Sequence, residues 1–310
     1  MLNKSIWLLW LQGWDSAPWL VREVAESWKI NNPDWTNRYL SWSNLREYVE
    51  DTDYVFDPQR NISPQALSDI IRLSLLDRHG GVWADATLLC MQPLTPWIER
   101  AVRPAGIWMY HGHGGGMDGR FGPASWFIAA EQGSPIIRRW KRACDEYWRS
   151  RSEASDYFWL DGLFRRLFRE DETFRATWRR APHLYVEKGG QAHCFARRNR
   201  MLRDSAAVKH MLRERPPYVL KLWWKPWQAA FPAPESAACR RSNGYYAIQA
   251  SKRVVTVLHP MHSGRSLRFE AEMAWRNIAY FATRAARGWA RRSLEMLSRS
   301  TGLPRLASRR

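Results

Sequence analysis

Residues 63–89 read SPQALSDIIRLSLLDRHGGVWADATLL, and this stretch decides the fold predicted for the chain. Ser63 followed by Pro64 indicates a helix start, because a serine oxygen can accept a free backbone N–H and proline suits the first helical position. The apolar residues that follow recur with a period near 3.6, which predicts a helix with one buried face. Gly80 and Gly81 are expected to end this helix, since glycine adopts the left-handed conformation of a C-cap at little cost.

The residues after the two glycines predict a short buried strand with a carboxylate at its end. Residues 82–84 (VWA) are apolar, and Asp85 follows them directly. Open α/β folds bind their ligands at the carboxyl ends of the strands. On the preceding helix, Asp69 and Arg72 are three residues apart and therefore share a face. Two acids and a guanidinium in this layout suit a ligand that carries both hydroxyl and phosphate groups.

The rest of the chain alternates between strand and helix patterns, which predicts an α/β fold. A long amphipathic helix is expected at 135–149, and the segment at 231–242 reads as a linker. We predict a last strand within 245–258, from the alternating valines of VVTVL. The remaining strands are expected at 6–11, 37–42, 82–85, 107–110, 125–129 and 218–223.

The order of the motif residues resembles a known family. Asp-x-x-Arg, a short spacer and Gly-Gly-x-Trp-x-Asp-x-Thr are similar to the donor site of DXD-type glycosyltransferases. The match resembles the capsular polysaccharide synthesis family, related to the Och1-like mannosyltransferases and the clostridial toxin glucosyltransferases. It rests on six residues, namely Asp69, Arg72, Gly80, Gly81, Trp83 and Asp85.

The resemblance implies a GT-A-like (Rossmann-like) nucleotide-sugar-binding sheet with helical additions. It implies transfer of a hexose from a nucleoside-diphosphate sugar, by default a uridine diphosphate sugar, to a glycan or lipid-linked acceptor. The implied setting is capsular or cell-surface polysaccharide synthesis, with the anomeric configuration retained. Asp69 would hydrogen-bond the transferred sugar, Arg72 would hold sugar and phosphate, and Asp85 would hold hydroxyl groups and help to anchor a metal.

Residues 6–13 (IWLLWLQG) are similar to the start of the same family. The resemblance implies that the loop after this first strand touches the nucleotide. Trp10 would stack on the base and Gln12 would read its edge, because a ring offers a flat face and an amide offers both donor and acceptor atoms. Trp7 is expected in the core instead.

Two later blocks supply further candidates. Residues 156–164 (DYFWLDGLF) resemble a family block in which Asp161 matches an acid, and an acid on an apolar helix is costly to bury unless it is paired or working. Asp161 is thus a catalytic candidate, with a salt bridge to Arg165 or Arg166 as the structural alternative. Residues 218–225 (YVLKLWWK) are similar to another family motif, in which Lys221 would face the diphosphate and Trp224 would stack on a sugar or base.

A divalent metal, Mn²⁺ or Mg²⁺, is implied by the DXD resemblance, with Asp85 as a ligand. Thr87 stands in place of the second Asp of that motif, and a neutral hydroxyl is a weaker ligand. Arg72 and Lys221 would then carry part of the metal's role. His262, or His259, is a further candidate to close over the metal. His111 and His113, in a glycine-rich loop, could also bind a metal, but two histidines on such a loop are expected to be solvated.

Length and composition indicate a globular protein. The chain has 310 residues, of which 45% are hydrophobic and 14% aromatic. Its four cysteines are scattered without metal-ligand spacing, which favours reduced thiols and a cytoplasmic location. We expect no signal peptide, and no apolar run reaches the roughly 20 residues of a spanning helix.

The net charge of +18 calls for an anionic partner. From residue 271 onward there are nine arginines and two glutamates. We therefore divide the chain into a glycosyltransferase domain at 1–265 and a basic amphipathic helix and tail at 266–310. The helix is expected to bind an anionic membrane surface, on the cytoplasmic face of the inner membrane, or else to pack on the core with solvated arginines.

Two other functions compete with transfer. The charge alone favours a nucleic-acid-binding protein, but no zinc-finger, RNP or helix-turn-helix pattern accompanies it, so nucleic acid is not the expected partner. Thr87 favours a noncatalytic relative that binds sugar nucleotide only.

Overall fold

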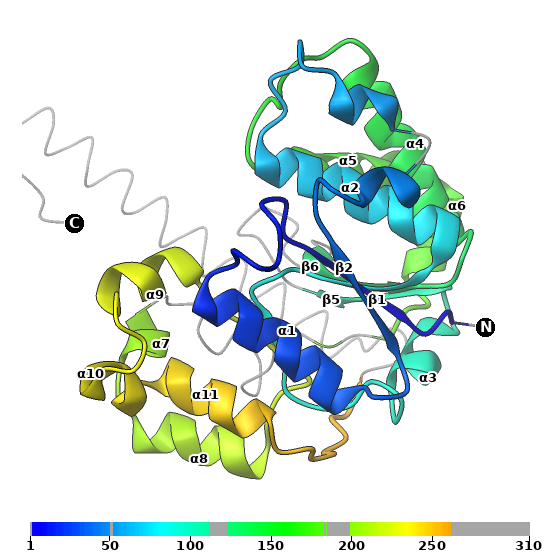
Figure 1. Ribbon diagram of the computed structural model, residues 1–310. Coiled ribbons are helices and arrows are strands. Elements are labelled where there is room, and N and C mark those ends of the chain that lie inside the picture. The colour runs from blue at the N-terminus through cyan, green and yellow to red at the C-terminus, as the bar shows by residue number, and fades with distance from the viewer. Residues whose placement is uncertain (1, 50–51, 112–122, 183, 185–198, 262–310) are drawn as a thin grey trace, which may run out of the picture. The chain divides into compact units, whose positions relative to one another are not determined.

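The computed structural model describes residues 2–49, 52–111, 123–182, 184 and 199–261, and the fold below is that of these residues. A five-stranded sheet lies at the centre, in the order β2-β1-β3-β6-β5 (Figure 1). Strands β2, β1 and β3 are parallel to one another, whereas β6 is antiparallel to both of its neighbours. The predicted α/β class is confirmed. The strands are β1 (Ser5–Leu9), β2 (Thr36–Leu40), β3 (Gly81–Ala84), β5 (Ile107–His111) and β6 (Pro123–Ala130).

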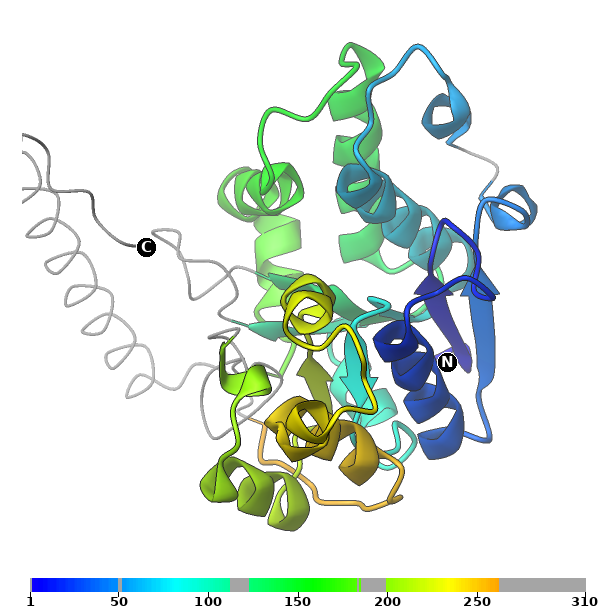
Figure 2. The same cartoon turned by 60° about the vertical axis from the view of Figure 1, so that its left-hand side comes forward.

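Helices cover both faces of this sheet, because its strands are apolar on both sides (Figures 1 and 2). In β1, Ile6 and Leu8 face one core, whereas Trp7 and Leu9 face the other. The helices of the second core are α2 (Pro64–His79), α4 (Pro135–Arg149), α5 (Trp159–Glu170) and α6 (Glu172–Trp178). The first core is closed by α1 (Trp19–Asn31), α3 (Ile98–Val102), α8 (Ala206–Glu214) and α11 (Asn243–Ser251).

The 63–89 stretch folds as predicted. The Ser63 hydroxyl accepts the N–H of Ala66 at 3.2 Å, and α2 runs from Pro64 to His79. Gly80 has a φ of 66° and Gly81 a φ of 96°, the left-handed region that favours glycine. The helix therefore turns sharply into β3.

A second, two-stranded sheet joins distant parts of the sequence. It pairs β4 (Leu88–Cys90) antiparallel with β7 (Val219–Lys221), and Leu88 lies opposite Lys221. The strand predicted at 218–223 thus exists, but outside the central sheet. Short elements complete the described residues: η1 (Leu45–Glu47), η2 (Asp53–Phe56), α7 (Asn199–Leu202), α9 (Trp224–Ala230) and α10 (Ala237–Arg241).

The last predicted strand is wrong. Residues 243–251 form α11, which begins because the Ser242 hydroxyl accepts the N–H of Tyr245 at 3.1 Å. The alternating valines that follow belong to no strand and lie largely in solvent, with Val254 60% exposed. The alternating pattern predicted a strand wrongly, because the Ser242 cap and the burial of Ile248 favour a helix at 243–251. The predicted linker at 231–242 also contains a helix, α10, capped by Ser236.

Some predictions lie outside the described residues. These are the metal ligand His262, most of the glycine-rich loop with His113, and the basic helix and tail at 266–310. Of the helices that the structure does describe, none combines the length and the apolar character needed to cross a membrane.

Candidate active site

The candidate site lies where adjacent parallel strands end. Trp10 follows β1 and Asp85 follows β3, and these two strands pair through Ile6↔Val82 and Trp7↔Trp83. The Asp85 backbone closes a tight turn toward β4, with its carbonyl accepting the N–H of Leu88 at 2.8 Å. The carboxylate is thereby fixed at the edge where α/β sheets bind ligands.

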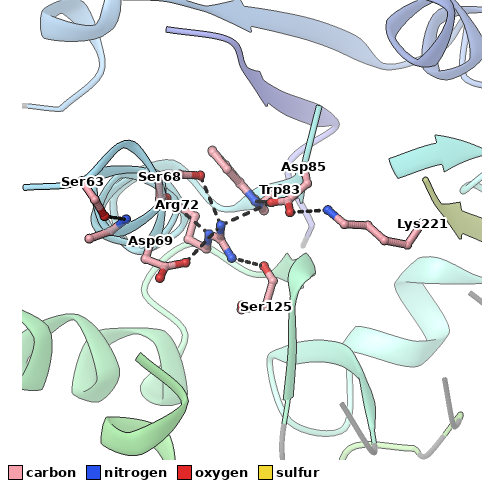
Figure 3. A network of polar contacts seen from close by, with 9 residues as sticks. Ser63, Ser68, Asp69, Arg72, Trp83, Asp85, Ser125 and Lys221 are labelled. Carbon is pink, nitrogen blue, oxygen red and sulfur yellow. Dashed lines mark hydrogen bonds and ion pairs between the residues drawn. The ribbon is translucent and has the colours of Figure 1, made fainter. Parts of the chain in front are cut away.

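Arg72 links the predicted acids (Figure 3). Its Nη2 lies 3.1 Å from Oδ1 of Asp69 and 3.3 Å from Oδ1 of Asp85. Nη1 donates to the carbonyl oxygen of Ser125 at 2.7 Å, and Nη2 also approaches the Ser68 hydroxyl at 3.2 Å. The side chain of Arg72 is 6% exposed. Its guanidinium therefore serves chiefly to hold Asp69 and Asp85 in place.

Asp85 is bound on both carboxylate oxygens. Oδ1 accepts the indole N–H of Trp83 at 3.0 Å as well as the contact from Arg72. Oδ2 accepts from the ammonium of Lys221 at 2.6 Å (Figure 3). The Asp85 side chain is 23% exposed and that of Lys221 is 13% exposed, so this pair borders solvent.

The charges around these acids set different pKa values. Burial alone would raise the pKa of Asp85, but the charges of Lys221 and Arg72 outweigh it and hold that pKa below its usual value. Burial raises the pKa of Asp69 to about 6, against the opposing charge of Arg72. Asp85 is therefore ionised at neutral pH, whereas Asp69 gains or loses its proton near pH 6.

Asp161 lies in the first turn of α5, close enough to interact electrostatically with Asp69. Burial and the charge of Asp69 raise the pKa of Asp161 to about 7. Its Oδ1 is buried without a hydrogen-bond partner among the described residues. Arg165 lowers the pKa from a distance, but the salt bridge to Arg165 or Arg166 considered above is not formed within α5. Asp161 is thus a third, partly buried acid near Asp69, and unlike Asp69 and Asp85 it pairs with no cation among the described residues.

Aromatic residues from distant segments meet where β1 ends and α9 begins. The rings of Trp10 and Trp224 lie edge to face with centroids 6.0 Å apart. Gln12 is exposed on the loop after β1. Behind Trp224, Trp19 stacks on Trp227 with centroids 6.0 Å apart. A cavity of about 150 Å³ is lined there by Pro18, Trp19, Leu20, Trp224, Trp227, Gln228, Phe231, Pro232 and Pro234.

The described residues do not fit a divalent metal in this arrangement. Nowhere in the described ranges do three His, Cys, Asp or Glu side chains gather into a metal-binding group, and both carboxylate oxygens of Asp85 are already bound by other side chains. Thr87 is part of the turn, and its carbonyl accepts the N–H of Leu222 at 2.8 Å. His259 is buried in the core, with its ring 2.8 Å from the Pro216 carbonyl. The other histidine considered, His111, is buried against Trp178 rather than solvated.

Sequence reasoning missed several members of the site. Trp83 donates a hydrogen bond to Asp85, and the carbonyl oxygen of Ser125 accepts one from Arg72. Both contacts depend on the pairing of β3 with β6, which the sequence does not reveal. Tyr157 is 74% exposed, and partial desolvation together with the carboxylates of Asp85 and Asp69 raises the pKa of its phenol. Its place in the DYFWLDGLF block, four residues before Asp161, was the available signal.

Comparison with known proteins gives one family and several relatives. The sequence model of the family described as "Capsular polysaccharide synthesis protein" matches residues 1–226. O-glycosyltransferase braB of Annulohypoxylon truncatum is 29% identical in a 164-residue alignment that covers 47% of this chain and 38% of that protein. Glycosyltransferase afumC of Aspergillus fumigatus is 27% identical in a 173-residue alignment that covers 47% of this chain and 41% of that protein. The chain thus spans less than half of the length of these curated relatives.

One solved structure overlaps more of the chain at lower similarity. The PaToxG glycosyltransferase covers 81% of this chain and 87% of its own, with a TM-score of 0.35 and 14% identity. That similarity is too low to support an argument about fold or activity.

Proposed function

The chain belongs to the capsular polysaccharide synthesis protein family, and from this premise we propose that it is a glycosyltransferase. It would move a hexose from a nucleoside-diphosphate sugar, with uridine diphosphate as the default donor, to a hydroxyl of a glycan or lipid-linked acceptor. The names of its relatives support the reaction class. The GT-A-like description of the sheet belongs to this proposal as well.

The observation that carries the proposal is the position of Asp85. A carboxylate that is held between Lys221 and Arg72 at the edge of parallel strands can accept hydrogen bonds from sugar or ribose hydroxyls. Lys221 brings a positive charge to the same edge, where it can stabilise the negative charge that develops on the leaving diphosphate. Asp69 would bind the transferred sugar, and Arg72 would act through the two acids that it holds.

The aromatic pair Trp10 and Trp224 is proposed to bind the nucleoside. The edge of one ring against the face of the other leaves ring surface for a base to stack on. Gln12, exposed on the same loop as Trp10, would read the base edge.

In the reaction, the bond between the anomeric carbon and the diphosphate oxygen breaks while an acceptor oxygen bonds to that carbon. The nucleoside diphosphate leaves with the electron pair, and its leaving oxygen takes up the proton that the acceptor hydroxyl loses. Retention of the anomeric configuration is proposed by family resemblance. Asp161, with a pKa near 7, would bind the acceptor or stabilise charge in the transition state.

The acceptor side of the proposal involves residues 266–310. The excess of arginine in that segment supports contact with an anionic membrane surface, where lipid-linked acceptors lie. We place this contact on the cytoplasmic face.

The test measures donor hydrolysis and thermal shift with a panel of nucleotide sugars, using wild type and Asp85→Asn. Asp34→Asn is a matched control, because Asp34 also pairs with a lysine at 2.7 Å but lies far from the site on an exposed surface. One donor should stabilise the wild type and the control, be hydrolysed slowly by both, and do neither with Asp85→Asn. Binding without hydrolysis or transfer would instead identify a noncatalytic relative, and absence of all binding would refute the proposal.

A further inference from the structure

Lys221 is a cation built into the site by tertiary structure. It comes from β7, whose pairing with β4 sets Lys221 opposite Leu88, three residues after Asp85. The resulting contact from Nζ to Oδ2 of Asp85 is 2.6 Å, and the lysine side chain is 13% exposed (Figure 3). A lysine so nearly buried and so close to the motif acid is positioned, not solvated.

Lys221 binds the carboxylate of Asp85, which would be a ligand of the metal in a DXD-type site. Oδ2 of Asp85 is bound by Lys221, and Oδ1 already accepts from Trp83 and lies against Arg72. At nucleotide sites Mg²⁺ is usually held by one or two carboxylates together with waters and the substrate's phosphates, so the oxygens of Asp85 would have to be open to it. Thr87 supplies no carboxylate, and a metal at Asp85 would lie beside two positive side chains. A divalent cation would therefore have to displace Lys221 or Arg72 from Asp85.

The same lysine has donor capacity left for a ligand. An ammonium group has three N–H donors, and within the described residues Nζ of Lys221 contacts Asp85 alone. Asp69 and Asp85 pair with Arg72 and Lys221, and the remaining N–H donors of Lys221 lie at the edge of this cluster, where a diphosphate can accept them.

We infer that Lys221 takes the place of the divalent metal, and that this site binds the diphosphate of its donor without one. The inference rests on the proposed function, and it names the cation that serves the diphosphate. Lysine suits this task as a compact, strongly hydrated point charge on a flexible stem.

The test is calorimetric binding of uridine, guanosine, cytidine, adenosine and thymidine diphosphates, each with a chelator and with Mn²⁺ or Mg²⁺. The proteins are full-length wild type, Lys221→Met, Lys221→Arg and the control Lys141→Met. Lys141 matches Lys221 closely, since its side chain is 8% exposed and its Nζ lies 2.6 Å from Oδ2 of Asp145. Thermal melting of each variant shows that it folds, and Lys221→Arg keeps the charge if the methionine variant does not fold.

For at least one diphosphate, the wild type and Lys141→Met should bind equally tightly, within about twofold, with chelator or with metal. Lys221→Met should lose at least about tenfold in affinity under chelator, and Lys221→Arg should recover part of it. Wild-type binding that requires Mn²⁺ or Mg²⁺, or unchanged binding by folded Lys221→Met, would overturn the inference while leaving the proposed function standing. Binding of no diphosphate under any condition would overturn the proposed function, and the inference with it.

Discussion

The ammonium nitrogen of Lys221 lies 2.6 Å from Oδ2 of Asp85, although the two residues are 136 positions apart in the chain. The contact exists because β4 and β7 pair immediately after the Asp85 turn. The candidate site thus depends on two separate segments, one carrying the carboxylate of Asp85 and one carrying the ammonium group of Lys221. Five further predictions concern the residues around this pair and the turn that leads into β3.

Arg72→Met should lower the free energy of unfolding by about 3 kcal/mol, because it leaves Asp69 and Asp85 without the buried cation between them. Arg138→Met is the control, because the Arg138 side chain is 62% exposed and its contact with Asp77 is long, at 3.8 Å. Removing this exposed ion pair should lower the free energy of unfolding by about 0.5 kcal/mol or less. Urea denaturation of both variants measures the difference. Equal losses would show that Arg72 does not organise the acids.

Stability should fall as pH rises from about 4 to about 7. The unfolded chain releases the protons of Asp161 and Asp69 near the ordinary value of 3.8, whereas the folded chain keeps them up to about 7 and about 6. The folded state therefore binds more protons in this window, and its advantage is lost as they dissociate. The lowered pKa of Asp85 acts in the opposite sense, but below pH 3.8.

Asp161→Asn should flatten this dependence, because the amide has no proton to lose. Its stability relative to wild type should therefore rise as pH increases from about 4 to about 8, across the range in which Asp161 ionises in the folded protein. Asp34→Asn serves as control, since the pKa of Asp34 is lowered and its titration falls outside the window. Thermal melting across this range makes the comparison. Parallel curves for wild type and Asp161→Asn would contradict the raised pKa.

Trp224→Ala should weaken binding of the donor's nucleoside diphosphate by about 5- to 150-fold, which corresponds to about 1–3 kcal/mol for base stacking on an aromatic ring. Trp42→Ala is the matched control, because Trp42 also meets an aromatic ring, that of Phe56, edge to face at 6.0 Å. Its effect should stay within about twofold. Calorimetry on both variants decides, and a similar loss in the control would remove the special role of Trp224.

Gly81→Ala should destabilise the chain by more than about 2 kcal/mol. Gly81 has a φ of 96°, and an added Cβ would lie 2.5 Å from the Ser5 carbonyl oxygen in the neighbouring strand. Gly162→Ala, in α5 with open space around it, should instead stabilise by about 0.5–1 kcal/mol. Chemical denaturation measures both changes. Tolerance of alanine at position 81 would argue against this close approach of β1 and β3.

Local chemistry predicted the elements around the motif. The Ser63 cap, the two glycines and the apolar run before Asp85 act over a few residues, so their outcome is visible in the sequence. The same holds for α4, whose predicted bounds at 135–149 match the structure. The strand predicted from the valines at 254–258 was wrong for the opposite reason. Whether such a segment is buried in a sheet depends on partners far along the chain.

Local sequence patterns predicted the α/β fold, and the family resemblance assigned Asp69, Arg72, Asp85 and Lys221 to one ligand. How these four side chains contact one another depends on the tertiary structure. Strand pairing put the Lys221 ammonium on Asp85, burial turned Arg72 inward to join the acids, and the loop after β1 met α9 through Trp10 and Trp224. Helix and strand periods report local backbone preference, whereas contacts over many residues arise from burying apolar surface and pairing charge across the whole chain.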